Sequence, residues 1–141
     1  MSSSLDFAVI DVDDGLLKVR VKASNGRFSA QSDLYADEES LKEAAAGLDG
    51  FPRNSQDARE VTLGAMSAEY AGGGFRMHLS CHDRAGHIEA RVTVRADVHV
   101  AQDESATFVI PLEAASLDRF VSAIRDLPLR VGATASLVGA A

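Results

Sequence analysis

The chain is poor in several residue types, and each shortage excludes a class of protein. Its single cysteine, Cys81, cannot form an internal disulfide, so a small disulfide-stabilised secreted domain is excluded. No apolar run approaches the roughly 20 residues that a membrane-spanning helix needs. The opening residues also lack the basic segment and long apolar run of a signal peptide. We therefore expect a cytoplasmic protein in which residues 1–141 form a single domain.

Basic residues are also scarce. Lysine and arginine number 14 against 21 acidic residues, giving a formal net charge of -7. No stripe of basic residues is present, which argues against nucleic acid and against an anionic membrane as partners, because phosphate binding depends on clustered lysine and arginine. An acidic surface can attract a basic protein, although it also keeps a protein soluble.

There is no tryptophan, and only 6% of the residues are aromatic, so the core has to be built mainly from Val, Leu, Ile and Ala with a few Phe. Alternating apolar and polar residues predict most of the regular structure to be strands. Turn signals at Asp14-Gly15 and Asn25-Gly26 predict hairpins, and the polar segment 53–60 predicts a loop. The strands are expected at 5–12, 17–22, 27–36, 61–70, 75–82, 87–95 and 106–112.

Two segments have the helical period instead. Residues 38–48 and 115–127 each place apolar side chains on one face, and Pro128 ends the second. The tail 128–141 is either an edge strand or frayed. The predicted fold is therefore α+β, a mostly antiparallel curved sheet of about seven to eight strands with two helices, near 38–48 and 115–127.

The start of the first helix has two interpretations. Asp37 is a candidate N-cap, and Glu38 and Glu39 lie in the first turn, where the helix dipole favours negative charge. These three acidic residues either stabilise the helix or provide a docking site for another protein, and they are our protein-binding candidates.

Three of the four histidines and the cysteine lie in "MHLSCHDRAGHIEARV", residues 77–92. The alternation predicts a hairpin in which His82 pairs with His87, Ser80 with Glu89 and His78 with Arg91. Cys81 would lie on the opposite, apolar face. The candidate metal ligands are His78, His82, His87 and Glu89. Because an open sheet face does not make such ligands converge or support them, we expect neither a metal nor another cofactor.

Known catalytic motifs are missing as well. The sequence has no G-x-S-x-G nucleophile motif and no dinucleotide-binding fingerprint. The glycine run 72–74 lacks the lysine and the Ser or Thr of a phosphate-binding loop, and no predicted helix follows it. We expect no catalytic residues and no enzyme activity.

Several segments between residues 26 and 127 match a pattern of small bacterial proteins. The matching segments are Gly26-Arg27-Phe28, the helix at Leu41 to Leu48, Gly86-His87-Ile88 and Leu112 to Phe120. In these the chain resembles a group of proteins that sit beside the WapI-type immunity proteins. The resemblance implies binding and neutralisation of a toxin encoded nearby, and it supplies no catalytic residues.

These observations predict a non-enzymatic protein-binding module. The resemblance implies that it is an immunity protein that neutralises a bacterial toxin, and the acidic surface favours a basic toxin as its partner. The alternative is a small-ligand-binding domain with a pocket between the sheet and the helices. A homodimer formed through an edge strand is a further possibility.

Overall fold

The computed structural model describes residues 2–140. Within them, eight strands and two helices follow one another along the chain, together with a short 3₁₀ helix at Val100–Gln102. The elements are β1 (Ser4–Asp13), β2 (Leu16–Ser24), β3 (Ser29–Ala36), α1 (Glu38–Leu48), β4 (Ala58–Gly64), β5 (Gly74–Cys81), β6 (Ile88–Arg95), β7 (Ser105–Leu112), α2 (Ala114–Arg125) and β8 (Thr134–Val138).

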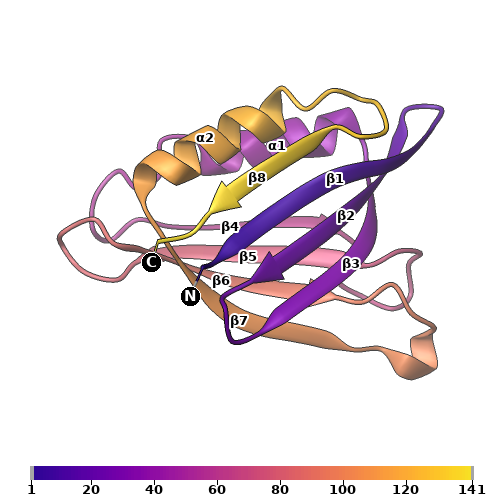
Figure 1. The fold of residues 1–141 in the computed structure, drawn as a ribbon, viewed down its shortest axis with the longest axis horizontal. Coiled ribbons are helices and arrows are strands. Elements are labelled where there is room, and N and C mark those ends of the chain that lie inside the picture. Colours follow the sequence, from indigo (N-terminus) through magenta and orange to yellow (C-terminus); the bar gives the residue numbers. More distant parts are fainter. Residues whose placement is uncertain (1, 141) are drawn as a thin grey trace.

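The strands form two antiparallel sheets of four, in the orders β3-β2-β1-β8 and β4-β5-β6-β7. The sheets face each other, and the two helices lie side by side along one edge of the molecule (Figure 1). There α1 packs on α2 and β4, and α2 packs on β8. The predicted α+β class and both helices are confirmed, and the structure adds that the strands divide between two sheets.

The core lies between the sheets and beneath the helices. Alternation along each strand turns the apolar residues inward, so β2 buries Leu17, Val19 and Val21 while the lysines and arginine between them face outward. Phe7 of β1 contacts two other rings edge to face, that of Phe75 at 5.3 Å and that of Phe120 at 5.4 Å. These aromatic contacts join both sheets and α2.

Five connections lie together at one end of the molecule, which we call the loop end (Figure 1). They are residues 14–15, 37, 65–73, 96–104 and 126–133. Hydrogen bonds hold several of them to the strands: Gly132 N–H donates to Val9 O at 2.9 Å, and Gly73 N–H donates to Asp33 O at 2.8 Å. The chain ends meet at the opposite end, where Gly139 N–H donates to Ser3 O at 2.8 Å.

The third and fourth strands have boundaries that differ from the sequence predictions. The fourth strand covers Ala58–Gly64 rather than 61–70, so part of the predicted loop 53–60 is strand and residues 65–70 are irregular. Gly64 has a φ of +71°, which ends the strand. The third strand begins at Ser29, because the Asn25 side chain accepts hydrogen bonds from the N–H groups of residues 27 and 28. Of the two alternatives predicted for the tail, the structure shows the edge strand: Thr134–Val138 forms β8, which pairs with β1.

Candidate functional site

The histidine-rich hairpin has the predicted register. His78 is opposite Arg91 and Ser80 is opposite Glu89, and His82 N–H donates to His87 O at 2.7 Å. Cys81 packs partly against the core, with its Sγ 3.7 Å from Asn54 O. The sulfur and the imidazoles therefore lie on opposite faces, and Cys81 has no histidine placed to act as its base.

Each imidazole of this hairpin pairs with a carboxylate. The His82 Nδ1 atom lies 2.9 Å from Glu89 Oε1, and the His87 Nδ1 atom lies 2.6 Å from Asp83 Oδ2. His78 Nδ1 is 3.5 Å from Glu60 Oε2. The three imidazole side chains are between 46% and 66% exposed. No group of three or more His, Cys, Asp or Glu within residues 2–140 is placed to hold a metal ion.

The pair of His87 with Asp83 shifts the titration of both groups. The hydrogen bond from His87 to Asp83, and the negative charge of Asp83, raise the pKa of His87 above its ordinary value of 6.5. The same hydrogen bond lowers the pKa of Asp83 below its ordinary value of 3.8. Because both groups are in water, this pair fastens the turn of the hairpin and encloses no site where a substrate would be held.

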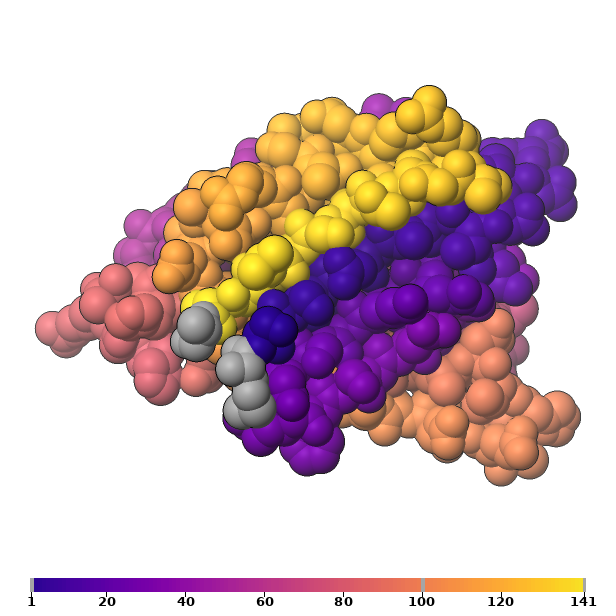
Figure 2. All heavy atoms as spheres, in the orientation of Figure 1, coloured from indigo at the N-terminus to yellow at the C-terminus, as the bar shows by residue number. Residues whose placement is uncertain are grey.

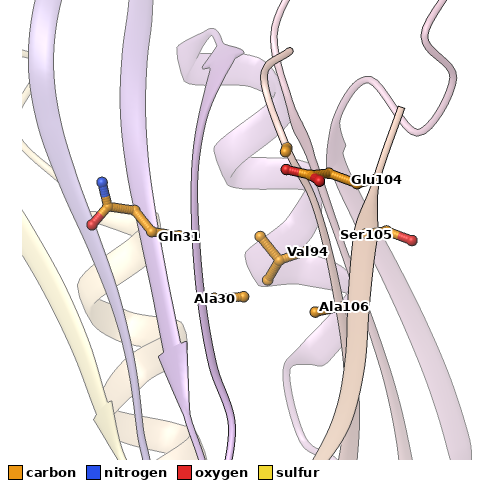
Figure 3. Close-up of a pocket in the computed structure, with 7 residues that line it drawn as sticks. Ala30, Gln31, Val94, Glu104, Ser105 and Ala106 are labelled. Atoms are coloured by element: carbon orange, nitrogen blue, oxygen red, sulfur yellow. The ribbon is translucent and has the colours of Figure 1, made fainter. Parts of the chain in front are cut away.

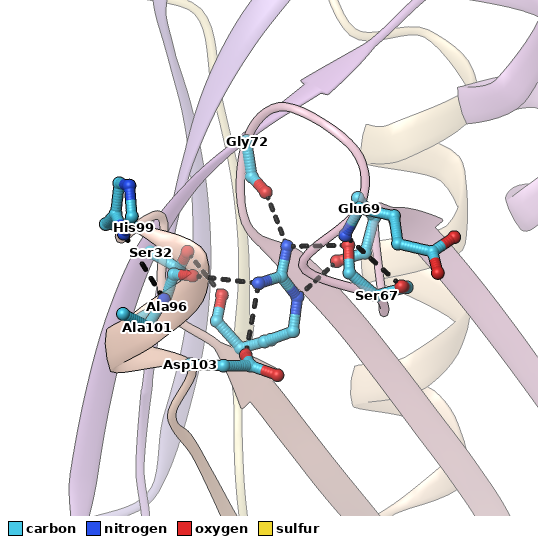
Figure 4. Close-up of polar contacts among 10 residues, drawn as sticks. Ser32, Ser67, Glu69, Gly72, Ala96, His99, Ala101 and Asp103 are labelled. Atoms are coloured by element: carbon cyan, nitrogen blue, oxygen red, sulfur yellow. Dashed lines mark hydrogen bonds and ion pairs between the residues drawn. The ribbon is translucent and has the colours of Figure 1, made fainter.

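A buried arginine lies near the loop end, at a position where the alternation along 87–95 predicts an outward-facing polar side chain. Arg95 is only 4% exposed and donates to three carbonyls of the β4–β5 loop: Ala65 O at 2.8 Å, Gly72 O at 2.8 Å and Ser67 O at 3.1 Å. Its other terminal nitrogen lies 3.3 Å from Asp103 Oδ1 (Figure 4). With its N–H groups occupied by the protein, Arg95 orders this loop and leaves no donor for a ligand.

The three protein-binding candidates lie at the loop end, and two of them are engaged in the helix. Asp37 and Ser40 form a capping box: Ser40 N–H donates to Asp37 Oδ1 at 2.7 Å, and Asp37 N–H donates to Ser40 Oγ at 3.0 Å. The hydrogen bonds from Ser40 lower the pKa of Asp37. Glu38 pairs with Lys42 at 2.8 Å. Glu39 has no ion pair with any residue that the structure describes.

The loop end holds the whole excess of negative charge. Within two residues of its five connections lie ten acidic residues, all exposed, against three arginines, of which Arg95 is buried. This difference of seven accounts for the whole net charge of -7, so acidic and basic residues are equal in number in the rest of the molecule. The acidic residues are Asp13, Asp14, Asp37, Glu38, Glu39, Glu69, Asp97, Asp103, Glu104 and Asp126.

Exposed apolar side chains gather at the same end. Of the eight large exposed hydrophobic residues in the described part of the chain, six lie within two residues of the loop-end connections. The β1–β2 turn and the β6–β7 loop project there into solvent (Figure 2). The six are Leu16, Tyr35, Tyr70, Val98, Leu129 and Val131, with Tyr70 68% and Val131 62% exposed.

The inner faces of the helices contribute to the core. In α1 the buried residues are Leu41, Ala44, Ala45 and Leu48, and in α2 they are Leu117, Phe120, Val121 and Ile124. One hollow between elements lies between β3 and the adjoining ends of β6 and β7, and another lies between the two helices, lined by Lys42, Ala46, Asp49, Arg125 and Asp126. A pocket between the sheet and the helices, as the small-ligand alternative requires, therefore gains no support from this packing.

No helix in the described residues has the length and apolar character to cross a membrane. In the comparisons with known proteins, no family model, no curated protein and no solved structure matches the chain.

Proposed function

We propose that this protein is a non-enzymatic binding module whose loop end docks a basic protein. One observation supports the proposal: the loop end has both the entire excess of acidic residues and six exposed large hydrophobic side chains. Together with the resemblance to proteins that sit beside the WapI-type immunity proteins, it favours an immunity protein that neutralises a bacterial toxin in the cytoplasm.

The chemistry of the loop end suits a protein partner. Protein interfaces combine a few apolar and aromatic anchors with a charged rim, and tyrosine is among the residues that contribute most to binding. Opposite charge on the partner accelerates association and disfavours wrong partners. Tyr70 and Val131 are suited to be anchors, and the acidic residues around them select a basic surface.

Parts of this surface are fixed before a partner arrives. The Tyr35 ring packs over the backbone of Gly72, where an added Cβ would lie 2.8 Å from the ring, and the Lys18 ammonium lies 5.8 Å from the ring centroid. The capping box holds the start of α1, and Arg95 holds the β4–β5 loop. A prearranged surface loses less conformational entropy on binding.

The test uses the product of the neighbouring gene as the candidate partner, co-expressed with this protein in a host that the product alone inhibits. The double variant Asp13→Lys and Glu39→Lys should lose protection. With purified proteins at low salt, its association rate should fall roughly tenfold or more, because electrostatic steering is reversed. A second variant, Tyr70→Ser, should mainly raise the dissociation rate.

The matched control is the double variant Glu113→Lys and Asp118→Lys. It changes the net charge by the same amount, but both residues lie outside the loop end. It should protect the host as well as the unmodified protein does. If both double variants lose protection equally, or if neither does, the loop end is not the docking surface and the proposal fails.

A further inference from the structure

The two sheets are left open along one side, between β3 and β7. The edge strands are β3 and β8 in one sheet and β4 and β7 in the other. The helices cover one edge of each sheet, because α2 packs on β8 and α1 packs on β4. The remaining edges, β3 and β7, do not pair with each other. An uncovered edge presents unpaired backbone groups and is a natural template for another strand.

Side-chain hydrogen bonds to backbone carbonyls join the two sheets at both ends of this opening. Near the β2–β3 loop, Asn25 Nδ2 donates to Val109 O at 3.1 Å. Towards the loop end, Ser32 Oγ donates to Arg95 O at 2.6 Å. Between them a groove of about 250 Å³ remains, lined by Ala30, Gln31, Val94, Ala96, Glu104, Ser105 and Ala106.

The β7 side of the groove has free backbone hydrogen-bonding groups. Glu104 O faces β6, where it accepts a hydrogen bond from Ala96 N–H. Val109 O and Pro111 O face away from β6. Val109 O accepts from the Asn25 side chain, and Pro111 O accepts from Ala140 N–H. In this alternation the backbone groups of Ser105 and Thr107 also point away from β6. They have no hydrogen-bond partner among the residues the structure describes.

The lining of the groove defines what would fit. Ala30, Val94 and Ala106 point into it as a small apolar floor, the Glu104 carboxylate extends towards it, and the side chains of Gln31 and Ser105 turn away (Figure 3). Its volume is below the roughly 300–1,000 Å³ of small-molecule sites, but it holds one or two side chains of a peptide. The lining contains an acidic residue and no basic one.

The part of the edge beside the groove also lacks the features that usually block strand addition, since Pro111 lies further along β7. Residues 105–109, "SATFV", contain no charge and no proline, and both are common protections of an exposed edge. Thr, Phe and Val favour extended backbone.

We propose that this groove binds a short extended segment of a partner polypeptide, which adds as a strand to β7 through the backbone groups of Ser105 and Thr107. The segment carries a small or β-branched side chain for the apolar floor and a lysine or arginine for Glu104. Backbone bonds supply affinity in this binding mode, and pockets for alternate side chains supply specificity. The groove shares Glu104 with the loop end but uses neither Asp13 nor the acidic turn of α1, and strand addition goes beyond the docking described above.

The probe is a displayed library of random 12-residue peptides, selected on the full-length protein. Selected sequences should be enriched in β-branched and basic residues. The strongest binder is then synthesised in two versions, with the backbone nitrogens methylated either at the odd-numbered or at the even-numbered residues. One version should bind roughly tenfold more weakly and the other should bind as before, because only every second residue donates a hydrogen bond to β7.

Two protein variants complete the test. Thr107→Pro removes an outward N–H while leaving the ladder to β6 intact, and Glu104→Lys reverses the charge at the groove; each should weaken the peptide roughly tenfold. Glu113→Lys, an equal charge change beyond the end of β7, should not. The double variant Asp13→Lys and Glu39→Lys should also bind the peptide normally, which separates this proposal from the loop-end proposal.

Three outcomes would overturn the inference. The first is that no peptide is enriched. The second is that neither set of methylated nitrogens nor Thr107→Pro changes the affinity for the peptide, and the third is that the protein is a homodimer in solution which Thr107→Pro converts to a monomer. The last result would assign the β7 edge to a second copy of this chain. The affinities of the methylated peptides are measured with the unmodified protein, so a variant that fails to fold does not affect that part of the test.

Discussion

At the scale of single residues, Arg95 shows what alternation along a strand does not reveal. The pattern groups it with Glu89, Arg91 and Thr93 on the outer face, yet both Val94 and Arg95 are buried. The reason is non-local: the β4–β5 loop folds over the end of β6 and brings three carbonyls to the guanidinium. Buried arginines are found where such partners satisfy them, and nothing in residues 88–95 alone indicates those partners.

Replacing this side chain should be severe. Arg95→Met keeps the length of the side chain but leaves the carbonyls of Ala65, Ser67 and Gly72 without their donors. We expect the free energy of unfolding, measured with urea, to fall by about 2–4 kcal/mol, since each buried unsatisfied group costs about 1–3 kcal/mol. Arg91→Met, on the exposed outer face, should change it by less than about 0.5 kcal/mol.

The hairpin turn should respond to pH through His87. Its pKa is raised by Asp83, so the stabilisation that the pair gives the turn is full below pH 6.5 and is lost as the pH rises through the higher folded pKa. Proton titration followed by NMR should show Asp83→Asn returning the His87 pKa towards 6.5. A His87 pKa that does not change in this variant would show that Asp83 is not the cause.

At the scale of elements, the strands and helices that have strong periodicity were predicted within a few residues. Residues 38–48 form α1 as expected, and the hairpin of β5 and β6 has the predicted register. The weak prediction at 61–70 was wrong because "LGAMSAEY" continues the apolar pattern past the point where the backbone of Gly64 turns. An added Cβ at Gly64 would lie 2.5 Å from Gly73 O and 2.7 Å from the Cβ of Leu34 in β3, which is remote in sequence, so this position requires glycine.

The glycine run gives a prediction with a matched control. Three consecutive glycines indicate by themselves only a permissive backbone, whereas the structure shows that a Cβ at Gly73 would lie 1.8 Å from Ser32 Oγ and 2.6 Å from Arg95 O. Gly73→Ala should therefore disrupt the junction between the sheets and lower the urea midpoint strongly. Gly47→Ala, in α1 with its nearest neighbour at 3.5 Å, should instead stabilise the protein by about 0.5–1 kcal/mol.

At the scale of the whole molecule, the sequence predicts how many strands there are and which face of each is buried, but it does not predict which strands are neighbours. Alternation is a local property, whereas the division into two sheets depends on long-range contacts such as that of Phe7 with Phe75. The candidate site shows the same limit. The three acidic residues at the start of α1 were found from the helix pattern, but the assembly of five connections into one surface required the fold.

The last strand completes this architecture, so its removal should affect more than the tail. β8 pairs with β1, and its Ala135 and Leu137 are buried beside α2. Deletion of residues 134–141 should abolish cooperative unfolding monitored by circular dichroism, because α2 loses its support on the first sheet. Val138→Ser, at an exposed position of the same strand, should leave the transition nearly unchanged.

The hydrogen bond between Gly139 and Ser3 brings the two ends of the described chain together, far from the loop end. A fluorophore or a surface tether attached to either terminus would thus orient the acidic loops outward into the medium. A short linker joining the termini would also permit a circular permutant reopened at the exposed turn of Gly15, where an added Cβ would have no neighbour within 4 Å.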